Sequence, residues 1–156
     1  MSDTSQHVAC PNCAAINRIP RTRPASKAKC GRCHEPLFRG KPLAVNTSGF
    51  ELHVGRSDIL VLADFWASWC GPCKAMAPAY ERAAAELEPA YRLLKVDADQ
   101  EPALAAQYGV SGIPTLILFA GGKPVARSAG AMDTRRIVEW AHARAPVSSS
   151  RQPSGP

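Results

Sequence analysis

Six cysteines are the residues of this sequence best suited to chemistry, and they form three Cys-x-x-Cys pairs: Cys10/Cys13, Cys30/Cys33 and Cys70/Cys73. Two thiols at this spacing can bind a metal ion from one tight turn, or they can form and break a disulfide reversibly. Structural disulfides are rare in a reducing compartment. Metal binding and redox catalysis are therefore the two chemistries that the sequence has to distinguish.

The first two pairs have the spacing of a four-cysteine zinc site, because sixteen residues separate Cys13 from Cys30. Residues 1–42 contain only six large apolar side chains, too few for an independent core, so a metal ion would have to supply the folding free energy. His7 or His34 could replace one ligand, and a disordered segment with free cysteines is the alternative. We predict one structural Zn²⁺ per chain, bound by Cys10, Cys13, Cys30 and Cys33.

The same segment holds the whole surplus of positive charge. Residues 1–42 carry eight Lys or Arg and two acidic residues, a net charge of +6, whereas residues 43–156 carry eleven of each sign. A basic segment suggests nucleic acid. Phe38 is its one aromatic residue, however, and cannot form a stacking platform for bases. The positive charge can instead offset the negative charge of a zinc–thiolate site, so we expect no nucleic-acid partner.

The third pair lies between two elements that would give its thiols different roles. Residues 59–65 read as a buried strand and residues 71–87 as a helix. Cys70 would then lie at the helix N-terminus, where unpaired N–H groups and the helix dipole stabilise a thiolate. Cys73 would follow one turn later on the same face. We infer that Cys70 attacks a substrate disulfide and that Cys73 resolves the mixed disulfide. A metal site is the weaker interpretation here, because no further ligand pair is near.

The remaining pattern predicts three more strands and three more helices. The strands are expected over 91–96, 115–120 and 124–128, and the helices over 48–55, 101–108 and 134–144. Gly121 and Gly122 predict a tight hairpin turn, and Pro78 predicts a kink in the helix of residues 71–87. Strand–helix alternation that closes with a hairpin indicates an α/β fold with a mixed sheet. The predicted domains are a metal-binding module over 1–42, an α/β domain over 43–144 and a disordered tail over 145–156.

The stretch Trp69-Cys-Gly-Pro-Cys-Lys74 resembles the active site of the thioredoxin family, and the resemblance covers about residues 43–144. Asp64 in Ala-Asp-Phe-Trp-Ala matches the family's buried aspartate, and Lys95 in Leu-Lys-Val-Asp matches its lysine partner. Further matches are Pro78, Ile113-Pro114-Thr115 and Gly130. With its N-terminal cysteine pairs, the whole chain is similar to the bacterial thioredoxins of the second type, which carry a zinc finger.

This resemblance implies a thioredoxin fold with a mixed central sheet, preceded by a small zinc ribbon. It implies a protein-disulfide reductase that an NADPH-dependent thioredoxin reductase regenerates. It also implies that Asp64, with Lys95 as its partner, accepts the Cys73 proton; desolvation should raise the pKa of this carboxyl. A purely structural charge pair is the alternative. A cis Ile113–Pro114 bond and a substrate-binding rim are implied as well, the rim formed by Trp69, Gly71, Pro72, Ile113, Pro114 and Gly130.

The sequence also bears on location and partners. No apolar run approaches the roughly 20 residues that span a bilayer, and the first residues lack the apolar stretch of a secretory signal. We therefore expect a cytoplasmic protein with no membrane partner. We further expect a monomer that interacts with disulfide-containing client proteins and with thioredoxin reductase. Two other functions are an adaptor that only docks proteins, and a redox sensor that releases zinc on oxidation.

Overall fold

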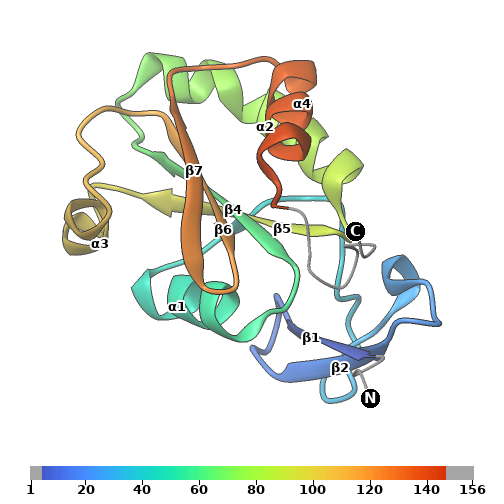
Figure 1. Ribbon diagram of the computed structural model, residues 1–156. Helices are drawn as coiled ribbons and strands as arrows, with labels where there is room; N and C mark the ends of the chain where they lie inside the picture. Colours follow the sequence, from blue (N-terminus) through green and yellow to red (C-terminus); the bar gives the residue numbers. More distant parts are fainter. Residues whose placement is uncertain (1–4, 147–156) are drawn as a thin grey trace.

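The computed structural model describes residues 5–146 and contains a five-stranded mixed sheet and a separate two-stranded sheet (Figure 1). The larger sheet has the order β3-β5-β4-β6-β7. Strands β3 and β4 pair parallel with β5, whereas β6 pairs antiparallel with β4 on one side and with β7 on the other. Its strands are β3 (Leu43–Ala44), β4 (Leu60–Trp66), β5 (Tyr91–Asp97), β6 (Thr115–Ala120) and β7 (Lys123–Ala129). The predicted α/β fold with a mixed sheet is confirmed.

Helices cover both faces of this sheet. One apolar cluster joins α2 and α4 to residues such as Leu62 and Leu93, and a second joins α1 and α3 to residues such as Ala63 and Leu94. Successive strand residues therefore point into opposite layers, as the continuous apolar runs predict. The helices are α1 (Thr47–Arg56), α2 (Gly71–Leu87), α3 (Pro102–Gln107) and α4 (Thr134–Arg144).

Most element boundaries lie within two residues of the predicted ones. Helices α2 and α4 and strand β6 have the predicted bounds, because local signals decide their ends. The carboxylate of Asp133, for example, accepts a hydrogen bond of 2.9 Å from the Arg136 N–H and caps α4. Pro78 lies inside α2 without ending it. The predicted disordered tail begins at Ala145, and its residues 147–156 lie outside the described part of the chain. No helix in the described range is long and apolar enough to cross a bilayer.

An N-terminal module precedes the large sheet and contains a hairpin that the sequence analysis did not predict. Its strands β1 (Ser5–Ala9) and β2 (Ile16–Pro20) pair antiparallel, and a short 3-10 helix, η1 (Ala25–Lys27), follows. A small buried cluster holds the module together and includes Val8, Ile19 and Leu37. The same cluster includes Ile59, which directly precedes β4. The residue that leads into β4 thus adds to the small apolar cluster of the module.

Buried Arg92 of β5 links the module to the sheet. Its Nη2 donates hydrogen bonds to the carbonyls of Ala9 (3.1 Å) and Leu37 (2.8 Å). Its Nη1 lies 3.4 Å from the Glu88 carboxylate, and both side chains are almost fully buried. Glu88 in turn accepts a hydrogen bond of 2.7 Å from the Gly40 N–H. One buried ion pair therefore satisfies three backbone groups of the module.

The outer edge of β1 makes the second link. The His7 N–H and Nδ1 both lie within 3.0 Å of the Asp58 carboxylate, and the Asp58 N–H donates to the His7 carbonyl at 2.7 Å. The Ala9 N–H donates to the Ser57 hydroxyl at 3.1 Å. This edge of the hairpin is therefore covered by the residues between α1 and β4.

We predict that Arg92→Met lowers the free energy of unfolding of the metal-loaded protein by about 3–5 kcal/mol, because it leaves the Glu88 carboxylate and two module carbonyls buried without their partner. Urea denaturation measures this change. Arg135→Met is the matched control, since it breaks an exposed pair with Glu139 and should cost about 0–1 kcal/mol. Equal losses in the two variants would contradict the link.

Candidate functional site

The dithiol lies where the sequence analysis predicts it, between β4 and α2. Cys70 is the N-cap of α2, and its sulfur accepts a hydrogen bond of 3.2 Å from the Cys73 N–H. The two residues form a disulfide, with their Cα atoms 5.2 Å apart, and both are buried. The Cys70 sulfur thus lies at the positive end of the helix dipole, where the backbone N–H groups of the first turn have no partner within the helix. This environment stabilises a thiolate on Cys70 once the disulfide is reduced.

The loop before β6 brings the predicted rim residues to this disulfide. The Ile113–Pro114 peptide bond is cis, as the resemblance implies. The Ile113 carbonyl oxygen lies 3.8 Å from the Cys70 sulfur. The Gly130 N–H donates to the Pro114 carbonyl at 2.9 Å, which places Gly130 beside the same loop. Apart from its chain neighbours and the backbone of its own helix, nothing lies within 4 Å of the position where a side chain on Gly71 would begin, so the surface next to Cys70 is open there.

An exposed aromatic side chain stands next to the dithiol. Trp69 is 69% exposed, although it is a large apolar residue. Its indole Nε1 donates a hydrogen bond of 2.7 Å to the Asp99 carboxylate, which fixes the ring in place. Asp99 is not recognisable from the sequence, because it follows a different strand, β5, and no motif marks it. The arrangement presents an oriented apolar surface to any protein that approaches Cys70.

Asp64 is a buried acid on β4, only 1% exposed. Its Oδ1 has no hydrogen-bond partner in the described part of the chain. Burial raises the pKa of Asp64 from its ordinary value of 3.8 to about 7, and the positive charge of Lys95 opposes that rise. Asp64 and Lys95 are paired in the β4–β5 register. The carboxyl therefore titrates near neutral pH.

Asp64 and Lys95 do not form a direct ion pair. Among residues 5–146 no cation lies within 4.0 Å of the Asp64 carboxylate. The Lys95 Nζ lies instead 4.5 Å from the centre of the Trp66 ring, a cation–π contact. Lys95 thus acts on Asp64 through space and leaves the carboxyl without a bound counter-ion. This finding argues against the alternative that a structural salt bridge explains the two residues.

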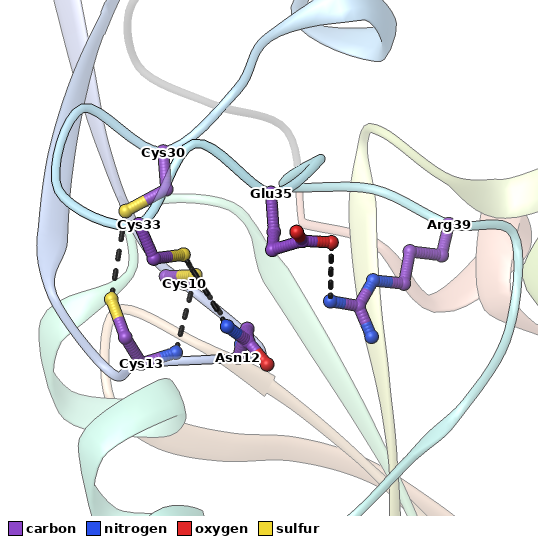
Figure 2. Close-up of polar contacts among 7 residues, drawn as sticks. All are labelled: Cys10, Asn12, Cys13, Cys30, Cys33, Glu35 and Arg39. Atoms are coloured by element: carbon purple, nitrogen blue, oxygen red, sulfur yellow. Dashed lines mark hydrogen bonds and ion pairs between the residues drawn. The ribbon is translucent and has the colours of Figure 1, made fainter.

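The four N-terminal cysteines form one compact cluster (Figure 2). Their sulfurs all lie within 4.8 Å of one another, with Cys10 to Cys33 at 3.7 Å and Cys13 to Cys30 at 3.6 Å. A tetrahedral ion with metal–sulfur bonds of about 2.3 Å needs sulfur–sulfur separations of about 3.8 Å. The donor set and its dimensions therefore fit a bound metal ion. His7 and His34 lie outside this cluster, and His7 is bonded to Asp58.

Two identical backbone turns build the cluster. The Cys10 N–H donates to the Ala15 carbonyl and the Cys30 N–H donates to the Glu35 carbonyl, each at 2.8 Å. These bonds turn the chain back on itself after each pair, so both thiols of a pair point to the same side. The turn requires a positive φ at the residue after the second cysteine. These residues are Ala14 (69°) and His34 (68°).

Side-chain amides donate hydrogen bonds to the sulfurs of Cys33 and Cys30 and lower the pKa of both thiols. The Asn12 side chain donates to the Cys33 sulfur at 3.5 Å and the Asn17 side chain to the Cys30 sulfur at 3.4 Å. The pKa of Cys30 is lowered to about 5, first by the Cys33 backbone N–H and then by Asn17. The role of Asn17 is not among the sequence-based predictions. An asparagine near a cysteine knuckle was the available signal.

Comparisons with known proteins agree with both parts of this site. Residues 41–143 match the family model described as Thioredoxin, and residues 9–35 match the zinc-ribbon model described as Thioredoxin 2, N-terminal. Thioredoxin C-3 of Corynebacterium nephridii is 38% identical over 133 residues, which cover 85% of this chain and 91% of that protein. A thioredoxin of Haemophilus influenzae is 41% identical over 98 residues, which cover 63% of this chain and 92% of that protein.

A solved structure is similar as well. A variant of thioredoxin from Halobacterium salinarum superposes with a TM-score of 0.63 and is 34% identical in sequence. The match covers 71% of this chain and 96% of that one. The likeness therefore extends over nearly all of that structure.

We predict that Asp64→Asn changes how stability depends on pH. Because folding raises the pKa of this carboxyl, its contribution to stability is complete below the unfolded value near 3.8 and is lost as the pH rises through about 7. Between pH 5 and pH 8 the oxidised wild type should lose about 2–3 kcal/mol relative to Asp64→Asn. Denaturation of both proteins across this range measures the difference; a difference that does not change with pH would contradict the assignment.

Proposed function

Since the chain belongs to the thioredoxin family of protein-disulfide oxidoreductases, we propose that it reduces disulfides in client proteins with Cys70 and Cys73. The observation that carries the proposal is the Cys70–Cys73 disulfide at the N-terminus of α2, beside an open rim. A structural disulfide has no need of a helix N-terminus, whereas an attacking thiolate is stabilised there.

The reaction takes two exchanges. The Cys70 thiolate attacks one sulfur of the client disulfide, forms a mixed disulfide and releases the other client sulfur as a thiolate that takes up a proton. The Cys73 thiolate then attacks the Cys70 sulfur and expels the second client thiolate, which is also protonated. Two electrons pass to the client, and the Cys70–Cys73 disulfide remains. The position of Cys73 one turn from Cys70 keeps the second attack intramolecular.

We place Asp64 as the group that accepts the Cys73 proton before the second exchange, through an intervening water molecule. A carboxyl whose pKa is about 7 is partly ionised at neutral pH and can both take up and release a proton. Lys95 is a positioning residue in this proposal. Its positive charge limits the rise in the pKa of Asp64 and so favours the ionised carboxylate, while its ammonium group lies over the Trp66 ring and not on the carboxylate.

The client would bind in extended form along the rim. The backbone of Ile113 lies next to the Cys70 sulfur and can pair with a strand-like segment. Trp69 would supply apolar contact area on the other side. We assign the substrate-binding rim to Trp69, Gly71, Pro72, Ile113, Pro114 and Gly130.

The resulting disulfide has to be reduced again. We propose an NADPH-dependent thioredoxin reductase as the electron donor and the cytoplasm as the location, where a reducing environment keeps the dithiol active. The chain would act as a monomer, because one chain supplies both sulfurs and the whole rim.

We predict that a reaction mixture of NADPH, thioredoxin reductase and the wild-type chain reduces insulin, which precipitates and scatters light. Cys70→Ser should abolish this activity, because the attacking thiolate is lost. Cys73→Ser should instead trap a covalent complex between Cys70 and the client, visible by mass spectrometry. Undiminished activity of Cys70→Ser would contradict the assignment. A wild-type chain that binds clients without reducing them would favour the adaptor function.

We further propose that Cys10, Cys13, Cys30 and Cys33 bind one structural Zn²⁺. Four thiolates fill a tetrahedral shell and leave no position for a substrate, so the ion would stabilise the module and take no part in the reaction. The turns at Ala14 and His34 hold the ligands in place.

We predict one zinc per chain in the purified protein, measured by plasma mass spectrometry. Cys13→Ser should lower the zinc content, because three thiolates bind the ion more weakly and leave its shell open. Cys70→Ser removes one of the six thiols at a different place and is the matched control, which should retain one zinc. Zinc retained by Cys13→Ser and lost by Cys70→Ser would reverse the assignment of the pairs.

A further inference from the structure

The N-terminal module contains a cleft that neither the dithiol nor the metal cluster uses. It has a volume of about 460 Å³, within the range of ligand sites. One wall is strand β2, and the other is η1 with the residues that follow it. Residues that line it include Arg18, Ile19, Arg23, Lys27, Lys29 and Leu37.

Four cations surround this cleft, and no acidic residue lines it. Arg18, Arg23, Lys27 and Lys29 are all exposed. None of the four forms an ion pair with an acid of residues 5–146. Arg39 of the same module, by contrast, lies 3.8 Å from the Glu35 carboxylate. Like charges at one cleft repel one another, so a negatively charged ligand there would gain electrostatic free energy.

The backbone of β2 offers a second feature, an open strand edge. In an antiparallel pair, opposite residues either exchange both hydrogen bonds or direct their N–H and C=O groups outward together. His7 uses its outward groups for Asp58, and Arg18 is its partner in the register. The backbone of Arg18 therefore faces away from β1, toward the edge that the large sheet does not cover. An exposed edge of this kind accepts an added strand.

The walls of the cleft favour a polypeptide over a nucleic acid. Its apolar surface comes from aliphatic and proline residues, including Ile19, Pro20 and Pro24. No aromatic side chain lines it, so bases would have nothing to stack on. Aliphatic side chains alternating with carboxylates along an extended chain match both the apolar wall and the cationic rim.

We propose that this cleft binds an acidic, extended segment of a partner polypeptide, which pairs with the β2 edge while its carboxylates meet Arg18, Arg23, Lys27 and Lys29. The proposal goes beyond disulfide reduction and does not depend on it. Strand β4 begins next to the module and ends before Cys70, and its seven residues span about 23 Å. Figure 1 shows the N-terminal module and the beginning of α2 at opposite ends of the sheet. Because the cleft belongs to the module and Cys70 is the N-cap of α2, a bound segment would leave Cys70 accessible.

Fluorescence polarisation tests the proposal with the full-length, zinc-loaded, oxidised chain, so that redox activity plays no part. The probe is a fluorescein-labelled decapeptide of alternating Glu and Val. We expect saturable binding that weakens as salt is added. The double variant Arg18→Gln/Lys27→Gln should raise Kd about tenfold, because two charge contacts are lost.

The matched control is Arg82→Gln/Arg136→Gln, which removes the same charge from two exposed residues on α2 and α4. It should leave Kd unchanged. Zinc content and insulin reduction of both double variants establish that they are folded. Equal weakening by the two double variants would overturn the proposal in favour of net charge alone. A ten-nucleotide oligothymidine that binds as tightly as the peptide, or no saturable peptide binding at low salt, would overturn it as well.

Discussion

The backbone that follows each Cys-x-x-Cys pair decides what its two thiols can do. All three pairs begin with the same turn. In each, the residue after the second cysteine donates its N–H to the carbonyl of the first cysteine: Ala14 to Cys10, His34 to Cys30 and Lys74 to Cys70. After this shared turn they diverge. In the module the chain reverses through a positive φ and the thiols face a common point. After Cys70 the helix continues to Leu87, and the thiols lie at a helix N-terminus. One spacing thereby yields a metal cluster and a redox dithiol.

The features predictable from sequence are those that local signals determine. The apolar run of β4, the Asp133 cap and the Pro72 in the first turn of α2 each fix an element by themselves. The pairing of Cys10 with Cys33 across the cluster, and the β1–β2 hairpin, depend on contacts between distant residues. A five-residue strand without a clear alternation carries too weak a pattern to be recognised. For the same reason Asp99, which orients Trp69, could not be found from the sequence.

The most consequential contact that sequence could not reveal is the burial of Arg92. In the pattern of β5 it is one charge in an apolar run, and only the fold shows that it reaches the carbonyls of Ala9 and Leu37. These bonds, and the one from Gly40 to Glu88, cross the predicted boundary at residue 42. The boundary at residue 42 lies where the composition changes, and it remains a prediction. The two parts that it separates share a buried cluster through Ile59. The module and the sheet are bonded as one unit at the end of the sheet remote from the dithiol.

This union also joins the metal cluster to the core electrostatically. Burial lowers the pKa of Arg92, whereas the charges of Glu88 and of the Cys10 thiolate raise it. A buried guanidinium needs nearby negative charge. The negative charge of an ionised Cys10, like that of Glu88, therefore helps to keep Arg92 charged where its hydrogen bonds are made. The cysteine cluster thus supports the fold in two ways. Its four sulfurs hold the two turns of the module together, and Cys10 favours the charged form of Arg92, which attaches the module to the sheet.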